Sequence, residues 1–266
     1  MNHLLRELAP ISESVWPLLD REAKERLTPA LAARRLIDFS GPHGWEHSAT
    51  NLGRAQALES APSEGASGLQ RRVLPLVELR VDFELTRAEL RDADRGADDV
   101  DLQALDAAAH RIAVAENVAV FHSWQGAVSG ISEASTHEPM PLGQTADAYP
   151  RTVAGAVERL LLSGIGGPYG LALGSEQYRL VIETAEHGGY PLLEHLRKII
   201  DGPIVWAPGV TGALLLSQRG GDFIFDSGQD VSIGYESHDP VVVALYLQES
   251  FSFHVATPEA AIAFTP

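Results

Sequence analysis

Apolar and polar residues alternate most regularly between Val73 and Leu85, where every second position is apolar or proline and charged residues fill most of the gaps. Because successive side chains of a strand point to opposite faces, this pattern predicts one strand with a buried face and a wet face, and Pro75 places its start at a sheet edge. The stretch from Val241 to Ala256 alternates over a greater length and predicts a bent strand in a central sheet. Shorter strands are predicted at 36–39, 169–173, 204–207 and 213–217.

Helical spacing is clearest from Asp101 onward, where Leu102, Leu105, Ala109 and Ile112 follow one stripe of a long helix. Ser14 is a capping residue for an N-terminal helix that should stop near Leu27, and Thr28-Pro29 repeats the start signal for a second short helix over 30–35. A capping-box pattern opens another helix at Thr86, and further helices are predicted at 152–162, 175–184 and 192–199. The mixture of helices and strands predicts an α+β fold.

The segment from Gly53 to Leu69 is rich in small and polar residues and holds few large apolar ones. Such a composition cannot form a core of its own, so we expect a loop or an arm. Gly220 and Gly221 describe a bend that leads into a strand at Phe223, with nothing reactive on it.

Composition narrows the class of protein. The chain has 266 residues, 45% of them hydrophobic, and a formal net charge of -16, which argues against a nucleic-acid partner. No apolar run approaches the ~20 residues that span a bilayer, and Arg6 and Glu7 interrupt the start where a signal peptide would be apolar. We therefore expect no membrane partner and a cytoplasmic location. The absence of cysteine excludes disulfides, thiolate ligands and a cysteine nucleophile.

Candidate catalytic motifs do not form a coherent set. Ser237-His238-Asp239 holds the letters of a triad, but adjacent side chains point apart, so the segment is predicted to be a turn. Asp230 stands where a nucleophile elbow ending at Gly234 would need its first glycine.

Candidate ligand sites are equally weak. The glycines of 164–170 follow a helix and lead into a strand, so no helix N-terminus is available for a phosphate. The acidic residues of 92–101 lack the order of an EF-hand loop. His43 and His47 are four apart, yet the glycines and proline around them argue against a helix that would align them as metal ligands. We predict no enzyme activity, no cofactor and no metal site.

Several separated motifs occur in order along the chain: residues 41–46, 167–169, 219–223, 228–235 and 249–253. With these motifs the chain resembles the encapsulins, that is, the family 1 encapsulin nanocompartment shell proteins of the linocin/bacteriocin type, which are related to tailed-phage major capsid proteins. The resemblance implies the Hong Kong 97-type capsid fold with a P-domain, an A-domain and an extended E-loop. It places the P-domain and its N-terminal helix at 1–49, the E-loop at 50–79, the spine helix within 80–134 (about 101–131), the A-domain at 135–218 and P-domain strands at 219–266.

The resemblance also implies a function. The chain should be a structural shell protein that assembles with itself into a closed icosahedral particle of about 60 subunits. The shell would enclose a cargo enzyme, either ferritin-like, a peroxidase or hemerythrin-like, through a C-terminal targeting peptide. Carried over to this sequence, the peptide groove would comprise Leu27, Arg34, Asp38, Val231 and Ile233. The peptide is expected to be mostly apolar with one basic residue, whose charge would lie near Asp38.

A pore loop is implied as well, at the fivefold axis of the shell. It would comprise Glu186, His187, Gly188, Gly189 and Tyr190. A ring of Glu186 side chains would attract cations, and protonation of His187 near pH 6.5, about its reference pKa, would weaken that attraction. Two other functions stay open at this point: a prophage or viral major capsid protein, and a hydrolase or bacteriocin.

Overall fold

The first of two five-stranded sheets is built around one long strand, β13 (Val242–Val255). Along one edge β13 pairs with β4 (Val77–Thr86), and along the other it pairs first with β12 (Ser232–His238) and then with β11 (Phe223–Ser227). These three pairings are antiparallel, and β1 (Asp38–Ser40) adds a parallel strand beside β11. The predicted long bent strand is therefore confirmed, and its partners explain why nearly all of β13 is buried.

The structure is a computed structural model and describes residues 3–143, 145–186 and 189–266.

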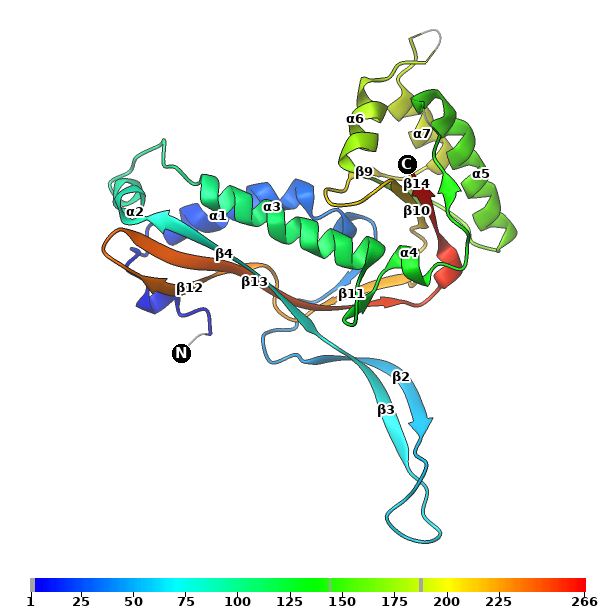
Figure 1. Ribbon diagram of the computed structural model, residues 1–266, viewed down its shortest axis with the longest axis horizontal. Helices are drawn as coiled ribbons and strands as arrows, with labels where there is room; N and C mark the ends of the chain where they lie inside the picture. Colours follow the sequence, from blue (N-terminus) through cyan, green and yellow to red (C-terminus); the bar gives the residue numbers. More distant parts are fainter. Residues whose placement is uncertain (1–2, 144, 187–188) are drawn as a thin grey trace.

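Two helices pack together on this sheet, α1 (Trp16–Ala30) and α3 (Gln103–Asn117) (Figure 1). Every third or fourth residue of each helix is buried in one apolar cluster with the inward side chains of β4, β12 and β13. Between β4 and α3 lies α2 (Arg87–Asp94), and Thr86 Oγ1 accepts a hydrogen bond from the Glu89 amide at 3.2 Å, which confirms the predicted cap.

The second sheet has the strand order β7-β14-β10-β8-β9. Three helices pack with this sheet in a second apolar cluster, and Figure 1 shows them around the sheet. The strands are β7 (Met140–Pro141), β8 (Tyr169–Leu173), β9 (Ile204–Trp206), β10 (Ala213–Ser217) and β14 (Ala261–Thr265), and the helices are α5 (Tyr149–Leu162), α6 (Ser175–Glu183) and α7 (Leu192–Ile200). Strands β8 and β10 are buried at every position, so their continuous apolar runs predicted them well.

A two-stranded arm leaves the first sheet and extends away from the rest of the chain (Figure 1). Its strands are β2 (Ala49–Ala57) and β3 (Leu69–Pro75), which among the described strands pair only with each other. Leu69 and Val73 are 72% and 47% exposed, so the arm has no core of its own, as its composition predicted. An isolated hairpin is marginally stable in water, which makes this arm a candidate for contact with another chain.

The prediction of a second helix over 30–35 is wrong about where that helix begins. Thr28 does not cap a new helix; its Oγ1 donates to the Lys24 carbonyl one turn back at 2.6 Å, and α1 continues through Pro29 to Ala30. Only a 3-10 turn, Ala33–Arg35, follows.

The predicted single strand over 73–85 is two strands. Leu76 interrupts it by donating its amide to the Ser48 carbonyl at 3.0 Å, so β3 ends in the arm and β4 begins in the sheet. Residues 77–79 consequently pair with β13, although the E-loop was placed at 50–79.

Two further boundaries differ from expectation. The spine helix does not reach residue 131: α3 continues as a π-helical turn, Val118–His122, and then gives way to the hairpin of β5 (Ser123–Trp124) and β6 (Val128–Ser129) and the short α4 (Ile131–Ala134). Strand β14 lies in the second sheet, beside β10, and so does not share a sheet with the other strands of 219–266.

The segment Ser237-His238-Asp239 was predicted to be a turn, but Ser237 and His238 end β12 and only Asp239 lies in the turn. Within the described ranges no helix is long and apolar enough to cross a membrane.

Candidate functional site

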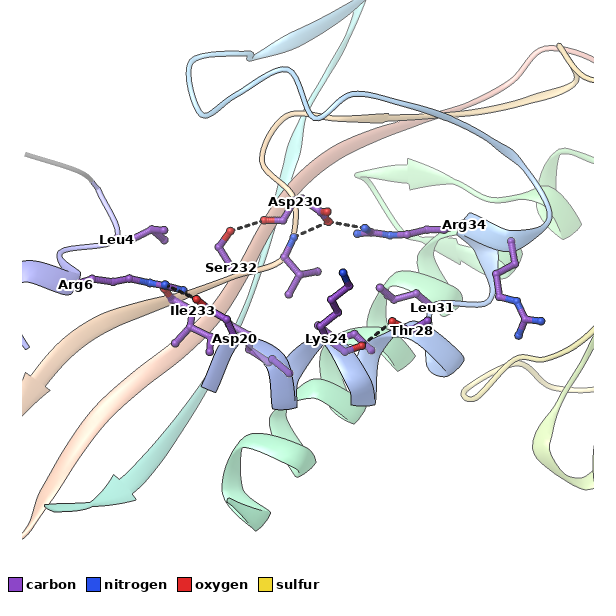
Figure 2. A pocket seen from close by; sticks show the side chains of 15 residues that line it. Leu4, Arg6, Asp20, Lys24, Thr28, Leu31, Arg34, Asp230, Ser232 and Ile233 are labelled. Carbon is purple, nitrogen blue, oxygen red and sulfur yellow. Dashed lines mark hydrogen bonds and ion pairs between the residues drawn. The ribbon is translucent and has the colours of Figure 1, made fainter. Parts of the chain in front are cut away.

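A groove of about 680 Å³ lies between α1 and the first residues of β12 (Figure 2). Its apolar floor comes from three elements: Ala23 and Leu27 lie on the inner face of α1 with Leu31 directly after its end, Val231 precedes β12 and Ile233 lies in it, and Leu247 of β13 pairs with Ile233. Ala23 and Leu27 are four apart in sequence and so share one face of α1.

The floor residues differ in how much they expose. Ile233 and Leu27 expose only 1% and 7% of their surface and pack mainly into the core, whereas Val231 is half-buried at the groove wall. Val231 is therefore the aliphatic side chain best placed to contact a bound molecule.

The N-terminal segment already lies along the edge of β12 at one end of this groove. The Tyr235 amide donates to the Leu4 carbonyl at 2.9 Å, and Arg6 Nε donates to the Ile233 carbonyl at 2.7 Å. The backbone amide of Tyr235 and the backbone carbonyl of Ile233 at this sheet edge are thus able to bond to groups outside the sheet.

Charged side chains surround the apolar floor. Arg6 binds both carboxylate oxygens of Asp20, at 2.9 and 2.7 Å, and Arg34 pairs with Asp230. Lys24 and Arg35 are exposed and have no ion-pair or hydrogen-bond partner for their side-chain nitrogens within the part of the chain that the structure describes. The groove therefore presents cations whose charge is not matched by a neighbouring carboxylate.

Arg34 ties the groove to two carboxylates in the protein interior. Its guanidinium donates to Glu116 of α3 and to Glu249 of β13 at 2.7 to 2.8 Å, and these two glutamates are 0% and 1% exposed. Burial works to lower the pKa of Arg34, but the neighbouring carboxylates of Glu116 and Glu249 outweigh it and hold that pKa above its ordinary value. Burial, followed by the charge of Glu116, raises the pKa of Glu249 well above its ordinary value, since one guanidinium cannot neutralise both carboxylates.

Four of the five residues predicted for the peptide groove line this one groove: Leu27, Arg34, Val231 and Ile233. Asp38 does not. It lies in an adjoining hollow of about 210 Å³, where its carboxylate accepts a hydrogen bond from the Gly221 amide, and Arg35 borders both spaces. Asp38 thus lies beside the groove and not in it, because the turn over 33–35 carries β1 away from the groove and onto β11.

The predicted pore loop falls between α6 and α7 in the chain, and the structure describes its residues Glu186, Gly189 and Tyr190 (Figure 1). His187 and Gly188 lie outside the described residues. Glu186 accepts a hydrogen bond from His195 Nδ1 at 2.9 Å, and its amide donates to the Tyr190 carbonyl at 2.8 Å. Tyr190 is 39% exposed and carries Lys198 over its ring at 4.9 Å. The loop is therefore closed at its base, with Gly189 at a φ of 81°.

A cluster at the base of the arm was missed by sequence reasoning. His43 and His47 both place Nε2 on the Asp226 carboxylate, at 2.8 and 3.1 Å, and Thr50 of β2 donates to the same carboxylate. The loop rather than a helix brings the two histidines together, so the absence of helical spacing was no guide. Burial works to raise the pKa of Asp226, but hydrogen bonds from Thr50, His47 and Ser40 outweigh it and hold that pKa below its ordinary value.

Comparison with known proteins shows the family to which this chain belongs. A family model described as "Encapsulating protein for peroxidase" matches residues 1–252. A type 1 encapsulin shell protein of Rhodospirillum rubrum is 47% identical over 98% of this chain and 96% of its own length. The chain belongs to the type 1 encapsulin shell protein family.

Other relatives agree with this assignment. The type 1 encapsulin shell protein of Mycobacterium tuberculosis is 40% identical over the full length of both chains. Among solved structures, a virus-like particle from Pyrococcus furiosus covers 93% of this chain and 98% of its own with a TM-score of 0.66 at 17% identity. A protein of Mycobacterium phage Ogopogo covers 86% and 90% with a TM-score of 0.57 at 12% identity. The predicted encapsulin family and the capsid-type fold are confirmed, and the chain is a structural shell protein and not an enzyme.

Proposed function

We propose that this encapsulin chain closes into an icosahedral shell of about 60 copies and holds an enzyme inside it through that enzyme's C-terminal peptide. The observation that carries the peptide proposal is the groove beside α1, in which Leu27, Arg34, Val231 and Ile233 meet. The domain ranges are proposals of the same kind, with the E-loop redrawn to the observed arm.

An extended peptide suits the groove in two ways. Alternate side chains of such a peptide would meet the aliphatic floor, and its backbone could bond to the edge of β12, where the Tyr235 amide and the Ile233 carbonyl already bond to Leu4 and Arg6. A peptide that continued past Arg35 would bring a basic residue to Asp38 in the adjoining hollow. This arrangement keeps the expected basic residue but places it outside the groove.

Self-assembly is supported by the arm. Leu69 and Val73 are exposed on a hairpin whose strands pair with no other strand in the described part of the chain, so a neighbouring copy is the natural cover for them. Light scattering of the purified chain should give a closed particle of tens of subunits, and Leu69→Asp with Val73→Asp should give small species. A wild-type chain that stays a monomer or dimer would overturn the proposal, and Val241→Asp, at a position 65% exposed in the turn before β13, is the matched control.

Cargo binding is tested on the half-buried wall of the groove. Ile233→Asp is a poor variant because a charge at a side chain 1% exposed would disrupt the core itself. Val231→Asp places the charge in the groove and should abolish co-purification of the enclosed enzyme while shells still form. Unchanged cargo content, with Val241→Asp again as control, would mean that the enzyme binds another surface. The cytoplasmic location is part of the same proposal, and cell fractionation tests it.

A further inference from the structure

The groove holds a cation without a counter-charge at its centre. Lys24 projects from α1 into the space between Ser232 and Arg34 (Figure 2). Four basic and two acidic side chains line the groove, in a chain whose formal net charge is -16. Among the side chains that line it, the groove therefore has two more cations than carboxylates, in a protein that is acidic as a whole.

The two acidic side chains are not available to Lys24. Asp20 accepts hydrogen bonds from both terminal nitrogens of Arg6. Asp230 is paired with Arg34 and also accepts a hydrogen bond from the Val231 amide at 2.8 Å. Arg34 is in turn satisfied by the buried carboxylates of Glu116 and Glu249. Lys24, with Arg35 at the border of the groove, is left to meet a charge brought by the occupant.

We propose that the groove captures the terminal α-carboxylate of the bound peptide, with the Lys24 ammonium as its principal partner. This inference rests on the proposed function, in which the occupant is the C-terminal end of an enclosed enzyme. A chain terminus supplies a carboxylate without ordering a further side chain, and a C-terminal segment is free to leave its own fold and lie extended. Lys24 thereby fixes the register of the peptide, and the aliphatic floor supplies the remaining contact.

The effect of Lys24 can be measured separately because the chain has one other lysine. Lys24 and Lys198 are its lysines, and Lys198 lies over the Tyr190 ring in the loop between α6 and α7. Since the Lys24 ammonium is exposed and has no partner among the described residues, Lys24→Met should fold and assemble normally. Lys198→Met is the matched control.

The experiment co-expresses the shell with a fluorescent reporter that ends in a six-residue tail of leucine, isoleucine or valine alternating with serine. A second reporter carries the same tail followed by Gly-Ser-Gly-Ser, which moves the carboxylate away from the aliphatic residues. A third carries the extended tail with one serine of the original six replaced by aspartate. Reporter content per shell protein is measured after purification at low salt.

We expect the tail with the flush terminus to load about fivefold more than the extended tail, a difference of the size of one partly exposed ion pair. Lys24→Met should remove this difference and Lys198→Met should keep it. Acetylation of Lys24 relative to Lys198 should fall when the flush tail is bound. The difference should also shrink in high salt.

Three outcomes overturn the inference. Equal loading of the flush and extended tails in wild type would leave peptide binding intact but refute capture of the terminus. Recovery of full loading by the aspartate tail alone would assign Lys24 to an acidic side chain instead. Failure of every tail to load would refute the apolar groove as the cargo site, and the inference with it.

Discussion

The guanidinium of Arg34 lies 2.7 Å from a carboxylate oxygen of Glu249, a side chain 1% exposed at the centre of the longest strand. The same guanidinium reaches Glu116 on α3 and Asp230 at the groove wall. One residue therefore joins the helix layer, the sheet and the groove. A substitution in this cluster should therefore change both the free energy of unfolding and the binding of a molecule in the groove.

Removal of Arg34 should be severe. Arg34→Ala leaves Glu116 and Glu249 buried without a cation, and breaking such a buried pair costs about 3–5 kcal/mol of unfolding free energy. Arg35→Ala removes a neighbouring exposed arginine that binds no carboxylate among the described residues, and it should change stability by about 0.5 kcal/mol or less. Urea unfolding of the two variants provides the comparison, and equal stability of the two would show that the cluster does not support the fold.

Glu249→Gln should change the pH dependence of stability. Burial and the Glu116 carboxylate raise the pKa of Glu249, so the folded chain keeps a proton that the unfolded chain releases near its reference value of about 4.3. Stability contributed by this proton is complete at acidic pH and is lost as pH rises toward the raised pKa. The amide of Gln carries hydrogens at every pH and avoids that loss.

Thermal unfolding at pH 5, 7 and 9 checks this expectation. The wild type should lose more stability than Glu249→Gln between the lowest and highest pH. Glu236→Gln alters an exposed carboxylate on β12 and should leave the wild-type slope unchanged. A slope that is the same in all three proteins would contradict the assignment.

Asp226→Asn tests the base of the arm. The hydrogen bonds of Thr50, His47 and Ser40 hold the pKa of Asp226 low against the effect of burial. Its contribution is therefore present above the unfolded pKa of about 3.9 and is lost as pH falls through the folded value. We expect Asp226→Asn to loosen β2 at neutral pH by about 1–3 kcal/mol, the cost of weakening a buried acceptor.

Hydrogen exchange of residues 49–57 measures that loosening directly. Wild-type protection of the arm should fall below about pH 4, whereas the variant should show little further change there. Asp147→Asn, at an exposed aspartate, is the control. Normal protection of the arm in Asp226→Asn would show that the cluster does not anchor it.

The sequence predicted the interior better than the boundaries. Residues 169–173 and 213–217 became β8 and β10 at those limits because a strand buried on both faces is a continuous apolar run. The alternation over 73–85 continues through Leu76, so nothing in the pattern marks the place where the arm ends and the sheet begins. That break depends on the Ser48 carbonyl, a contact that local periodicity does not contain.

The site divides in the same way. The resemblance identified four residues of the groove, but it could not show that Asp38 follows β1 into the next hollow, since that depends on the turn at 33–35. Glu116 and Glu249 are 133 positions apart in the sequence, and each lies in an otherwise apolar pattern of its own helix or strand. Only the packing of α3 against the sheet brings them onto one arginine.

The loop between α6 and α7 gives the last prediction, which rests on its proposed position at the fivefold axis. Glu186 would then be presented five times around a narrow opening and would raise the local concentration of cations. Its carboxylate is held by His195 at 2.9 Å, so the charge has a fixed place in the loop. Glu186→Gln keeps an acceptor for His195 but removes the charge, and Glu186→Lys reverses it.

Uptake of ferrous iron by an iron-oxidising cargo should therefore slow in the order wild type, Glu186→Gln, Glu186→Lys, over a range of about two- to tenfold at low salt. Stopped-flow oxidation in intact shells measures the rate, and light scattering verifies that assembly is unchanged. Glu183→Lys reverses a nearby charge on α6, outside the loop, and should have little effect. Equal rates in all four shells would mean that cations enter elsewhere, because a ring of charge at the entry point cannot be reversed without changing the local ion concentration.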